Sequence, residues 1–166
     1  MAKIYVGTYA KYNNGSIKGA WIDLAGHDKE SFLETCYELH KDESDPELMF
    51  QDFEGFPREY YSESSISDEL FDYLDLDEDD KEILEAYKQY DQNGTIEEAR
   101  ERYAGTYSDL QDWAYEYVSS CGILDGASET ARRYFDYDSF LKDCQLNGEI
   151  YSVELGWNKT IVFNVY

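Results

Sequence analysis

The sequence has few basic residues, few cysteines and no long apolar segment, and each shortage excludes a class of protein. No run of 18 apolar residues exists, so the chain is not expected to span a membrane, and residues 1–9 lack the apolar core of a signal peptide. Three widely spaced cysteines without a CxxC pair, Cys36, Cys121 and Cys144, predict reduced thiols rather than disulfides or a zinc site. A cytoplasmic location is the resulting expectation.

The motifs of common enzymes are also missing. The sequence contains no GxSxG, GxGxxG, HExxH or phosphate-loop pattern, and it has only two histidines. His27 lies at an expected loop-to-helix junction and His40 lies beside an apolar helix face, so both are interpreted as structural residues. Arg132 and Arg133 are interpreted as a surface or interface pair rather than a phosphate site. No cofactor is expected.

Negative charge is what the sequence has in excess. Its 166 residues include 37 Asp and Glu against 14 Lys and Arg, which gives a formal net charge of −23. Residues 30–80 hold 19 of those acids and two basic residues, with the densest run at residues 75–80. Such a charge usually accompanies disorder, but 17 Tyr, 8 Phe and 3 Trp supply apolar area for a thin core. A folded, slender body is therefore expected.

The first sixty residues show both strand and helix patterns. Residues 3–9, 20–24 and 47–53 are predicted strands, and a turn-rich segment around Asn13-Asn14-Gly15 separates the first two. Residues 28–40 are a predicted helix, because apolar and acidic positions recur at helical spacing. Its apolar side consists of Phe32, Leu33, Cys36, Leu39 and His40. Its other side carries Glu30, Glu34 and Glu38, which are expected to face water or a partner.

Helical patterns dominate after residue 57. The predicted helices span residues 67–76, 79–91, 95–104, 108–121, 128–135 and 136–146. Thr95 and Ser108 are each expected to cap a helix, since Glu98 and Gln111 stand three residues later, as in a capping box.

A β-hairpin is predicted to end the chain, with strands at residues 149–155 and 160–165. The fold class is therefore mixed α/β, of the α+β type, in three small modules. They are an N-terminal antiparallel sheet plus helix at residues 1–61, a central helical module at 62–104, and C-terminal helices plus a short sheet at 105–166.

Two kinds of acidic site can be tested on spacing alone. Asp75, Asp77 and Asp79 occupy positions 1, 3 and 5 of an EF-hand loop, but Asp80 stands where glycine is required, and Ala86 replaces the bidentate glutamate. No metal site is expected. A catalytic carboxylate pair would need a pocket that separates two pKa values. Among 37 acids, proximity alone does not indicate such a pair.

The density of charge is comparable to that of DNA. A solvated face is the simplest reading of acidic runs, yet a small domain needs a net charge of only about 2–8 for solubility. Duplex DNA carries about one charge per 1.7 Å, so 23 net charges correspond to about 39 Å of duplex. Acids four apart on a helix lie about 5–6 Å from each other, comparable to neighbouring phosphates. DNA mimicry is therefore the favoured interpretation.

The sequence also resembles the ArdA antirestriction proteins, DNA mimics carried by mobile genetic elements. The resemblance lies in residues 3–24, KIYVGTYAKYNNGSIKGAWIDL, in residues 49–57, MFQDFEGFP, and in residues 134–140 followed by 151–154. It implies an elongated, three-part α/β protein that forms a homodimer through its C-terminal part. It also implies that the partner is a type I restriction-modification enzyme, whose methyltransferase core it occupies in place of DNA.

The residues expected to contact the partner are acids predicted to be exposed, each acting as one of many phosphate-like charges. They are Glu30, Glu34, Glu38, Asp42, Glu43, Asp45, Glu47, Asp68, Glu69, Asp72, Asp75, Asp77, Glu78, Asp79, Asp80, Glu82, Glu85, Asp109, Asp112 and Glu116. The expected activity is competitive, non-enzymatic inhibition without a cofactor. An acidic adaptor for another basic protein is the main alternative, and an enzyme is the third.

Overall fold

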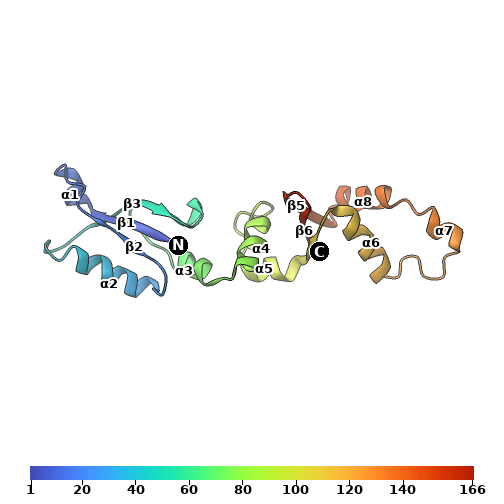
Figure 1. Ribbon diagram of the computed structural model, residues 1–166, viewed down its shortest axis with the longest axis horizontal. Coiled ribbons are helices and arrows are strands. Elements are labelled where there is room, and N and C mark those ends of the chain that lie inside the picture. The colour runs from blue at the N-terminus through green and yellow to red at the C-terminus, as the bar shows by residue number, and fades with distance from the viewer. The chain divides into compact units, whose positions relative to one another are not determined.

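The computed structural model describes residues 1–166 and divides the chain into two compact units, Met1–Asp77 and Glu78–Tyr166 (Figure 1). Each unit contains one three-stranded antiparallel sheet with helices packed on it. The mixed α/β fold class is thereby confirmed. The division into three modules stays a prediction: residues 62–77 belong to the first compact unit, and residues 78–104 belong to the second.

The first unit is built around a sheet with strand order β2-β1-β3. Its elements are β1 (Lys3–Thr8), α1 (Tyr9–Asn13), β2 (Ala20–Asp23), α2 (Lys29–Leu39), β3 (Leu48–Glu54), the 3₁₀ helix η1 (Arg58–Tyr60) and α3 (Asp68–Asp75). The alternation in β1 buries Ile4 and Val6 on one face, as period-2 patterning requires. A bulge between Tyr5 and Val6 shifts the register against β3.

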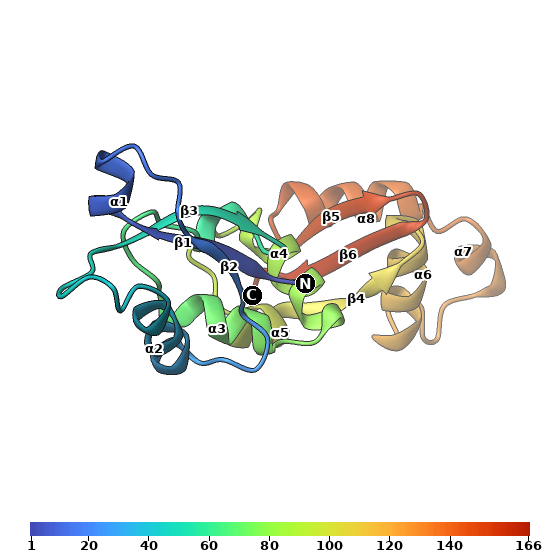
Figure 2. The ribbon, with the colours of Figure 1, turned by 60° about the vertical axis from the view of Figure 1, so that its left-hand side comes forward.

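Aromatic side chains fill the core of the first unit. The fully buried Phe32 of α2 has its ring centroid 6.1 Å from that of Phe50 in β3 and 6.0 Å from that of Phe71 in α3. The first contact packs α2 against the sheet, as Figure 2 shows, and the second packs α3 against α2. Their acidic sides are consequently left to solvent.

The second unit has a sheet with strand order β4-β6-β5. Its elements are α4 (Glu78–Lys88), α5 (Ile96–Arg102), β4 (Tyr103–Tyr107), α6 (Leu110–Ser120), α7 (Glu129–Arg133), α8 (Tyr137–Leu146), β5 (Ile150–Gly156) and β6 (Lys159–Asn164). The central strand β6 is buried on both faces: Ile161 and Phe163 pack with α4 and α5, while Val162 packs with α6 and α8. Burial on both faces explains the unbroken apolar run in this strand.

Most predicted elements are confirmed, including the closing hairpin and the capping box of α5. Thr95 Oγ1 accepts a hydrogen bond from the Glu98 N–H at 3.3 Å, and Glu98 Oε2 accepts one from the Thr95 N–H at 3.0 Å. The predicted cap at Ser108 is wrong, because Asp109 caps α6 by accepting from the Asp112 N–H at 2.9 Å. Both residues can cap, and the carboxylate of Asp109 takes the role.

Three other local predictions are corrected by the structure. The predicted helix over residues 95–104 ends at Arg102, and Tyr103–Tyr107 forms β4 because these residues pair with the open edge of β6. Helix α1, in part of the predicted turn-rich segment, is stabilised by the cap of Thr8, which accepts from the Lys11 N–H. Leu39 was expected on the apolar side of α2 but is exposed, because it lies at the last helical residue.

Candidate partner-binding surface

Helix α2 presents an ordered column of carboxylates. Its start is fixed by Asp28, whose side chain accepts a hydrogen bond from the Ser31 N–H at 2.9 Å, and this bond lowers the pKa of Asp28. The apolar side of the helix is held down by Phe32, so Glu30, Glu34 and Glu38 are all exposed. Glu38 pairs with Lys41, whereas Glu30 and Glu34 form no ion pair. The expected exposure of this column is confirmed.

Helix α3 presents a second set of exposed carboxylates in the same unit. It buries Leu70, Phe71 and Tyr73, and that packing leaves its acids exposed. Those acids are Asp68, Glu69, Asp72 and Asp75. Asp68 accepts from Lys29 Nζ of α2 at 2.9 Å, so one ion pair joins the two acidic helices. The structure thus links the start of α2 to the start of α3 through this ion pair.

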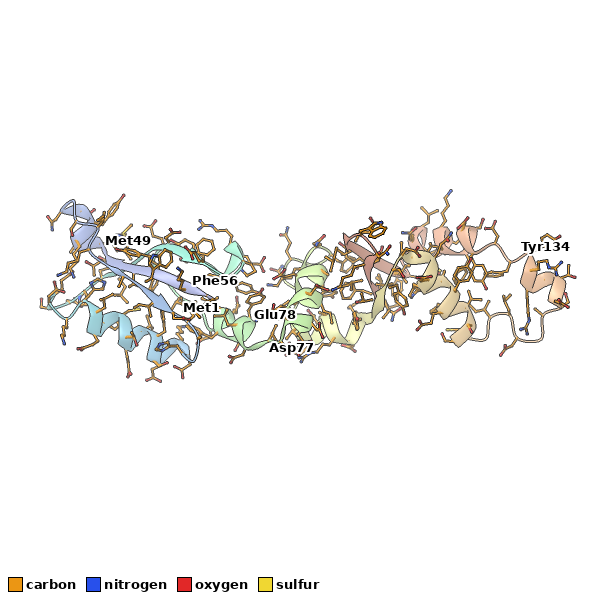
Figure 3. The ribbon with its side chains drawn as sticks, viewed as in Figure 1. Met1, Met49, Phe56, Asp77, Glu78 and Tyr134 are labelled. Carbon is orange, nitrogen blue, oxygen red and sulfur yellow. The ribbon has the colours of Figure 1, made fainter.

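The acidic run at residues 75–80 consists of two helix ends and the link between them. Asp75 is the last residue of α3, and Glu78, Asp79 and Asp80 form the first turn of α4. Asp77 lies in the connection, directly before Glu78 (Figure 3). Acids in a first turn are favoured by the helix macrodipole. Asp80 also pairs with Arg100, which lowers the pKa of the Asp80 carboxyl.

The remaining acids of the second unit lie on α4 and α6. On α4, Glu82 pairs with Lys159 at 2.5 Å, and Glu85 is exposed. On α6, Asp109 is the cap, and Asp112 accepts from Ser108 Oγ at 2.5 Å. Glu116 is exposed one turn further along. Some of these acids therefore cap a helix or form an ion pair, in addition to contributing negative charge.

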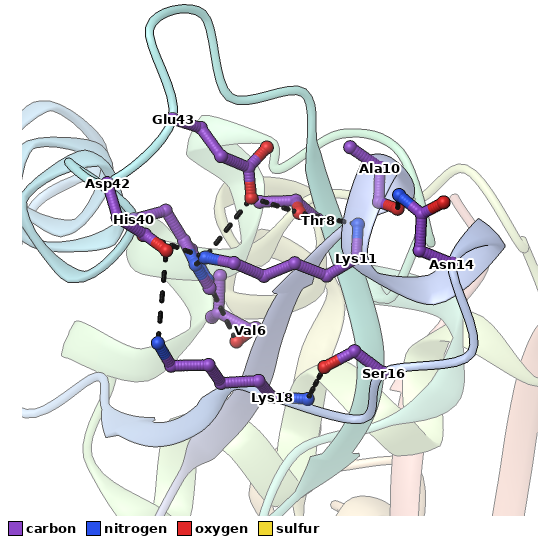
Figure 4. Close-up of polar contacts among 10 residues, drawn as sticks. All are labelled: Val6, Thr8, Ala10, Lys11, Asn14, Ser16, Lys18, His40, Asp42 and Glu43. Atoms are coloured by element: carbon purple, nitrogen blue, oxygen red, sulfur yellow. Dashed lines mark hydrogen bonds and ion pairs between the residues drawn. The ribbon is translucent and has the colours of Figure 1, made fainter.

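The connection after α2 forms an ion-pair cluster around Lys11 (Figure 4). Lys11 Nζ lies 2.8 Å from His40 Nδ1, 2.8 Å from Asp42 Oδ1 and 3.1 Å from Glu43 Oε1. An ammonium group can only donate, so His40 Nδ1 accepts, and His40 Nε2 donates to the Val6 carbonyl at 3.2 Å. We call this set the Lys11 cluster. No local sequence pattern indicates it, because Lys11 lies 29 residues before His40 in the chain.

Three members of the Lys11 cluster could in principle hold a metal ion. His40, Asp42 and Glu43 offer ligand atoms that lie within 4.8 Å of one another. The Lys11 ammonium reaches all three and uses its three protons on them. The cluster is therefore satisfied by a cation of the chain itself.

Replacing Lys11 by Met is expected to raise the pKa of Asp42 toward its ordinary value of 3.8. The hydrogen bond from Lys11 is the main cause of the lowered pKa, and the pKa of Glu43 is lowered first by Thr8 and then by Lys11. In the folded protein the pKa of Asp42 lies below its ordinary value, so its interaction with Lys11 stabilises the fold at pH values above that ordinary value. This stabilisation is lost as the pH falls through the lowered pKa. Carboxyl ¹³C NMR titration measures the change.

Two controls make this titration specific. Lys18→Met removes a cation that lies 3.8 Å from Asp42, so it should raise the pKa of Asp42 less. Asp80, whose partner is Arg100, should keep its lowered pKa in both variants. An Asp42 pKa that stays the same in Lys11→Met would contradict the assigned cause.

All twenty predicted contact residues are accessible to solvent. Seventeen are exposed, Glu43, Asp80 and Glu82 are half-buried, and none is buried. At least seven take part in ion pairs with basic side chains. No Asp or Glu of the chain is among its buried residues, and each carboxyl with a clearly shifted pKa is shifted downward.

Fold and surface together define a highly acidic, mixed α/β protein that presents its carboxylates to solvent. Residues 4–159 match the ArdA family, described as antirestriction protein. Since this match covers most of the 166 residues, the chain belongs to the ArdA antirestriction family, and the resemblance seen in the sequence is confirmed. A comparison with curated proteins gave no match. None of the helices is both long and apolar enough to cross a membrane.

Proposed function

We propose that this chain is a DNA mimic that inhibits type I restriction-modification enzymes by occupying their DNA-binding groove. Membership of the antirestriction family supports the biological role. The observation that supports the mechanism is the exposure of seventeen of the twenty predicted acids on packed helices and their flanks. Carboxylates held this way keep fixed spacings, as phosphates do on a duplex.

The physical basis is competition for a basic groove. A protein groove that binds DNA gains free energy when phosphates release their condensed counterions, and rigid carboxylates at similar spacing offer the same kind of attraction. Binding is reversible and needs no cofactor. Because cleavage and methylation both require DNA in the methyltransferase core, both are blocked.

The acids do not contribute equally to the negative electrostatic potential of the surface. An acid within an ion pair, such as Glu38 beside Lys41, has much of its charge cancelled locally. Glu30, Glu34, Glu69 and Asp72 are exposed and form no ion pair, so they contribute net negative potential. We therefore assign the main phosphate-like role on α2 and α3 to unpaired acids such as these four.

A non-enzymatic role also agrees with the state of the carboxyl groups. A general acid needs a raised pKa, usually through burial or a neighbouring like charge. The shifted carboxyls here are shifted downward by hydrogen bonds and cations, and none is buried. This chemistry favours permanently charged groups over proton donors.

We also propose that the inhibitor acts as a homodimer through residues 105–166. Two copies would double the net charge of −23 and lengthen the matched DNA accordingly. Light scattering of the full chain measures the mass directly. A mass of one chain, at the concentration that inhibits, would exclude the dimer while leaving the mimicry intact.

Displacement of DNA is the direct test of the function. A type I methyltransferase is bound to fluorescently labelled DNA, and the purified chain is titrated in while anisotropy is recorded. Competition predicts complete release of the labelled DNA. It also predicts that the apparent affinity of the chain for the methyltransferase falls as the concentration of DNA is raised. Formation of a ternary complex, or no release, would contradict the proposal. Release from an unrelated basic DNA-binding protein at the same concentrations would favour the adaptor alternative.

A further inference from the structure

A groove of about 550 Å³ lies within the first unit. Helix α2 contributes Leu33 and Tyr37 to it, and the buried Phe50 and Ile66 line its apolar part. Asp45 and Glu47, from the connection between α2 and β3, line it as well. The groove therefore combines apolar and acidic surfaces.

The charge in this groove is unbalanced. Asp45 and Glu47 are exposed and form no ion pair. Lys29 is the single basic residue of the lining, and its Nζ lies 2.9 Å from Asp68, so that cation is already compensated. The groove thus attracts positive charge.

Tyr37 supplies a free aromatic ring in the same groove. The residue is 50% exposed, and its ring contacts neither another ring nor a cation. Most tyrosines of the first unit differ in this respect: Tyr60 stacks on Tyr73, and Tyr61 stacks on Phe53. A half-exposed ring in a groove that two carboxylates also line is a suitable partner for a cation.

We propose that the groove receives one arginine side chain of the basic partner. This inference rests on the proposed function and deepens it by naming a localised contact. The alkyl stem of the arginine lies on Leu33 and Ile66, its planar guanidinium stacks on Tyr37, and Asp45 and Glu47 accept its hydrogen bonds. Lysine fits less well, because its compact, strongly hydrated ammonium lacks a planar face. This contact then adds one localised interaction to the attraction that the other acids share.

The groove can be tested without any restriction enzyme. N-acetyl-arginine amide is titrated into the isotope-labelled full chain, with the lysine analogue in parallel. We expect the NMR signals of Leu33, Tyr37 and Ile66 to shift until the groove is saturated. The dissociation constant obtained from these shifts should be lower for the arginine analogue than for the lysine analogue. Ser65→Trp, a neutral change at a lining residue, should abolish them by filling the groove. Shifts that do not saturate, or that persist unchanged in Ser65→Trp, would overturn the proposal.

Inhibition supplies the second test. Tyr37→Ala leaves the net charge unchanged, so a purely distributed mimic would keep its affinity for the methyltransferase. The arginine contact predicts a loss of about tenfold, as expected for a cation–π contact that is partly desolvated. Tyr12→Ala is the matched control, because Tyr12 is 55% exposed and lies outside the groove lining.

The outcomes separate the two proposals. Equal inhibition by the Tyr37→Ala and Tyr12→Ala variants would overturn the arginine contact while leaving the mimicry in place. Failure of the unmodified chain to displace DNA would overturn the proposed function, and the arginine titration would still decide whether the groove binds a guanidinium. Circular dichroism of each variant confirms that it is folded before either comparison is made.

Discussion

Raising NaCl from about 50 to 200 mM is expected to weaken the affinity of this chain for a type I methyltransferase by at least about tenfold. A protein that contacts 6–10 phosphates loses about 10³–10⁵ in affinity for DNA over this range, because counterion release becomes less favourable. The loss should be smaller here, since a protein surface condenses fewer counterions than DNA and at least seven of the acids are already in ion pairs.

The same salt should act in the opposite direction on the inhibitor itself. A net charge of −23 opposes the folded state by self-repulsion, and screening lowers that cost. Its Tm is therefore expected to rise with NaCl while its affinity falls. Equilibrium anisotropy measures the affinity, and thermal unfolding measures the Tm. Sucrose, which stabilises folding without screening charge, should raise the Tm without weakening binding. An affinity that does not change with salt would contradict electrostatic mimicry.

Local signals made much of the fold predictable. The apolar and acidic sides of α2 follow from its period, and the cap at Asp28 fixes where the helix begins. The hairpin of β5 and β6 was visible because apolar runs flank a turn, in which Asn158 adopts a positive φ of 60°. In these elements, neighbouring residues alone determine the local structure.

The parts that were missed depend on residues far apart in the chain. β4 is a strand because its residues pair with the edge of β6, whereas its first two residues, Tyr103 and Ala104, also fit the helical pattern that precedes them. The Lys11 cluster joins α1 to the connection after α2 across about thirty residues of sequence. The groove beside Tyr37 likewise exists only once α2 and β3 are packed together. Exposure of the acids was predictable, but their pairing with cations was not.

Because some acids are paired with cations and others are not, the contribution of net charge can be tested by comparing two variants of the first unit, each with four changed side chains. The fourfold variant Glu30→Gln, Glu34→Gln, Glu69→Gln and Asp72→Asn removes four unpaired charges from α2 and α3. Each acid is expected to contribute about 0–1 kcal/mol, so any single change should be nearly silent. Together they should weaken binding about 10²-fold, since each 1.4 kcal/mol is a factor of ten. DNA displacement measures the inhibition constant of each variant.

The matched control removes two ion pairs from the same region of the first unit. Glu38→Gln with Lys41→Gln, combined with Lys29→Gln and Asp68→Asn, also changes four side chains but keeps the net charge at −23. Distributed mimicry predicts nearly unchanged inhibition for this variant, because the net field of the surface is preserved. Its stability should fall slightly, whereas removal of the unpaired acids should raise stability by relieving repulsion. If one neutralised acid alone abolished activity, as loss of a catalytic group does by 10²- to 10⁴-fold, the enzyme alternative would replace mimicry.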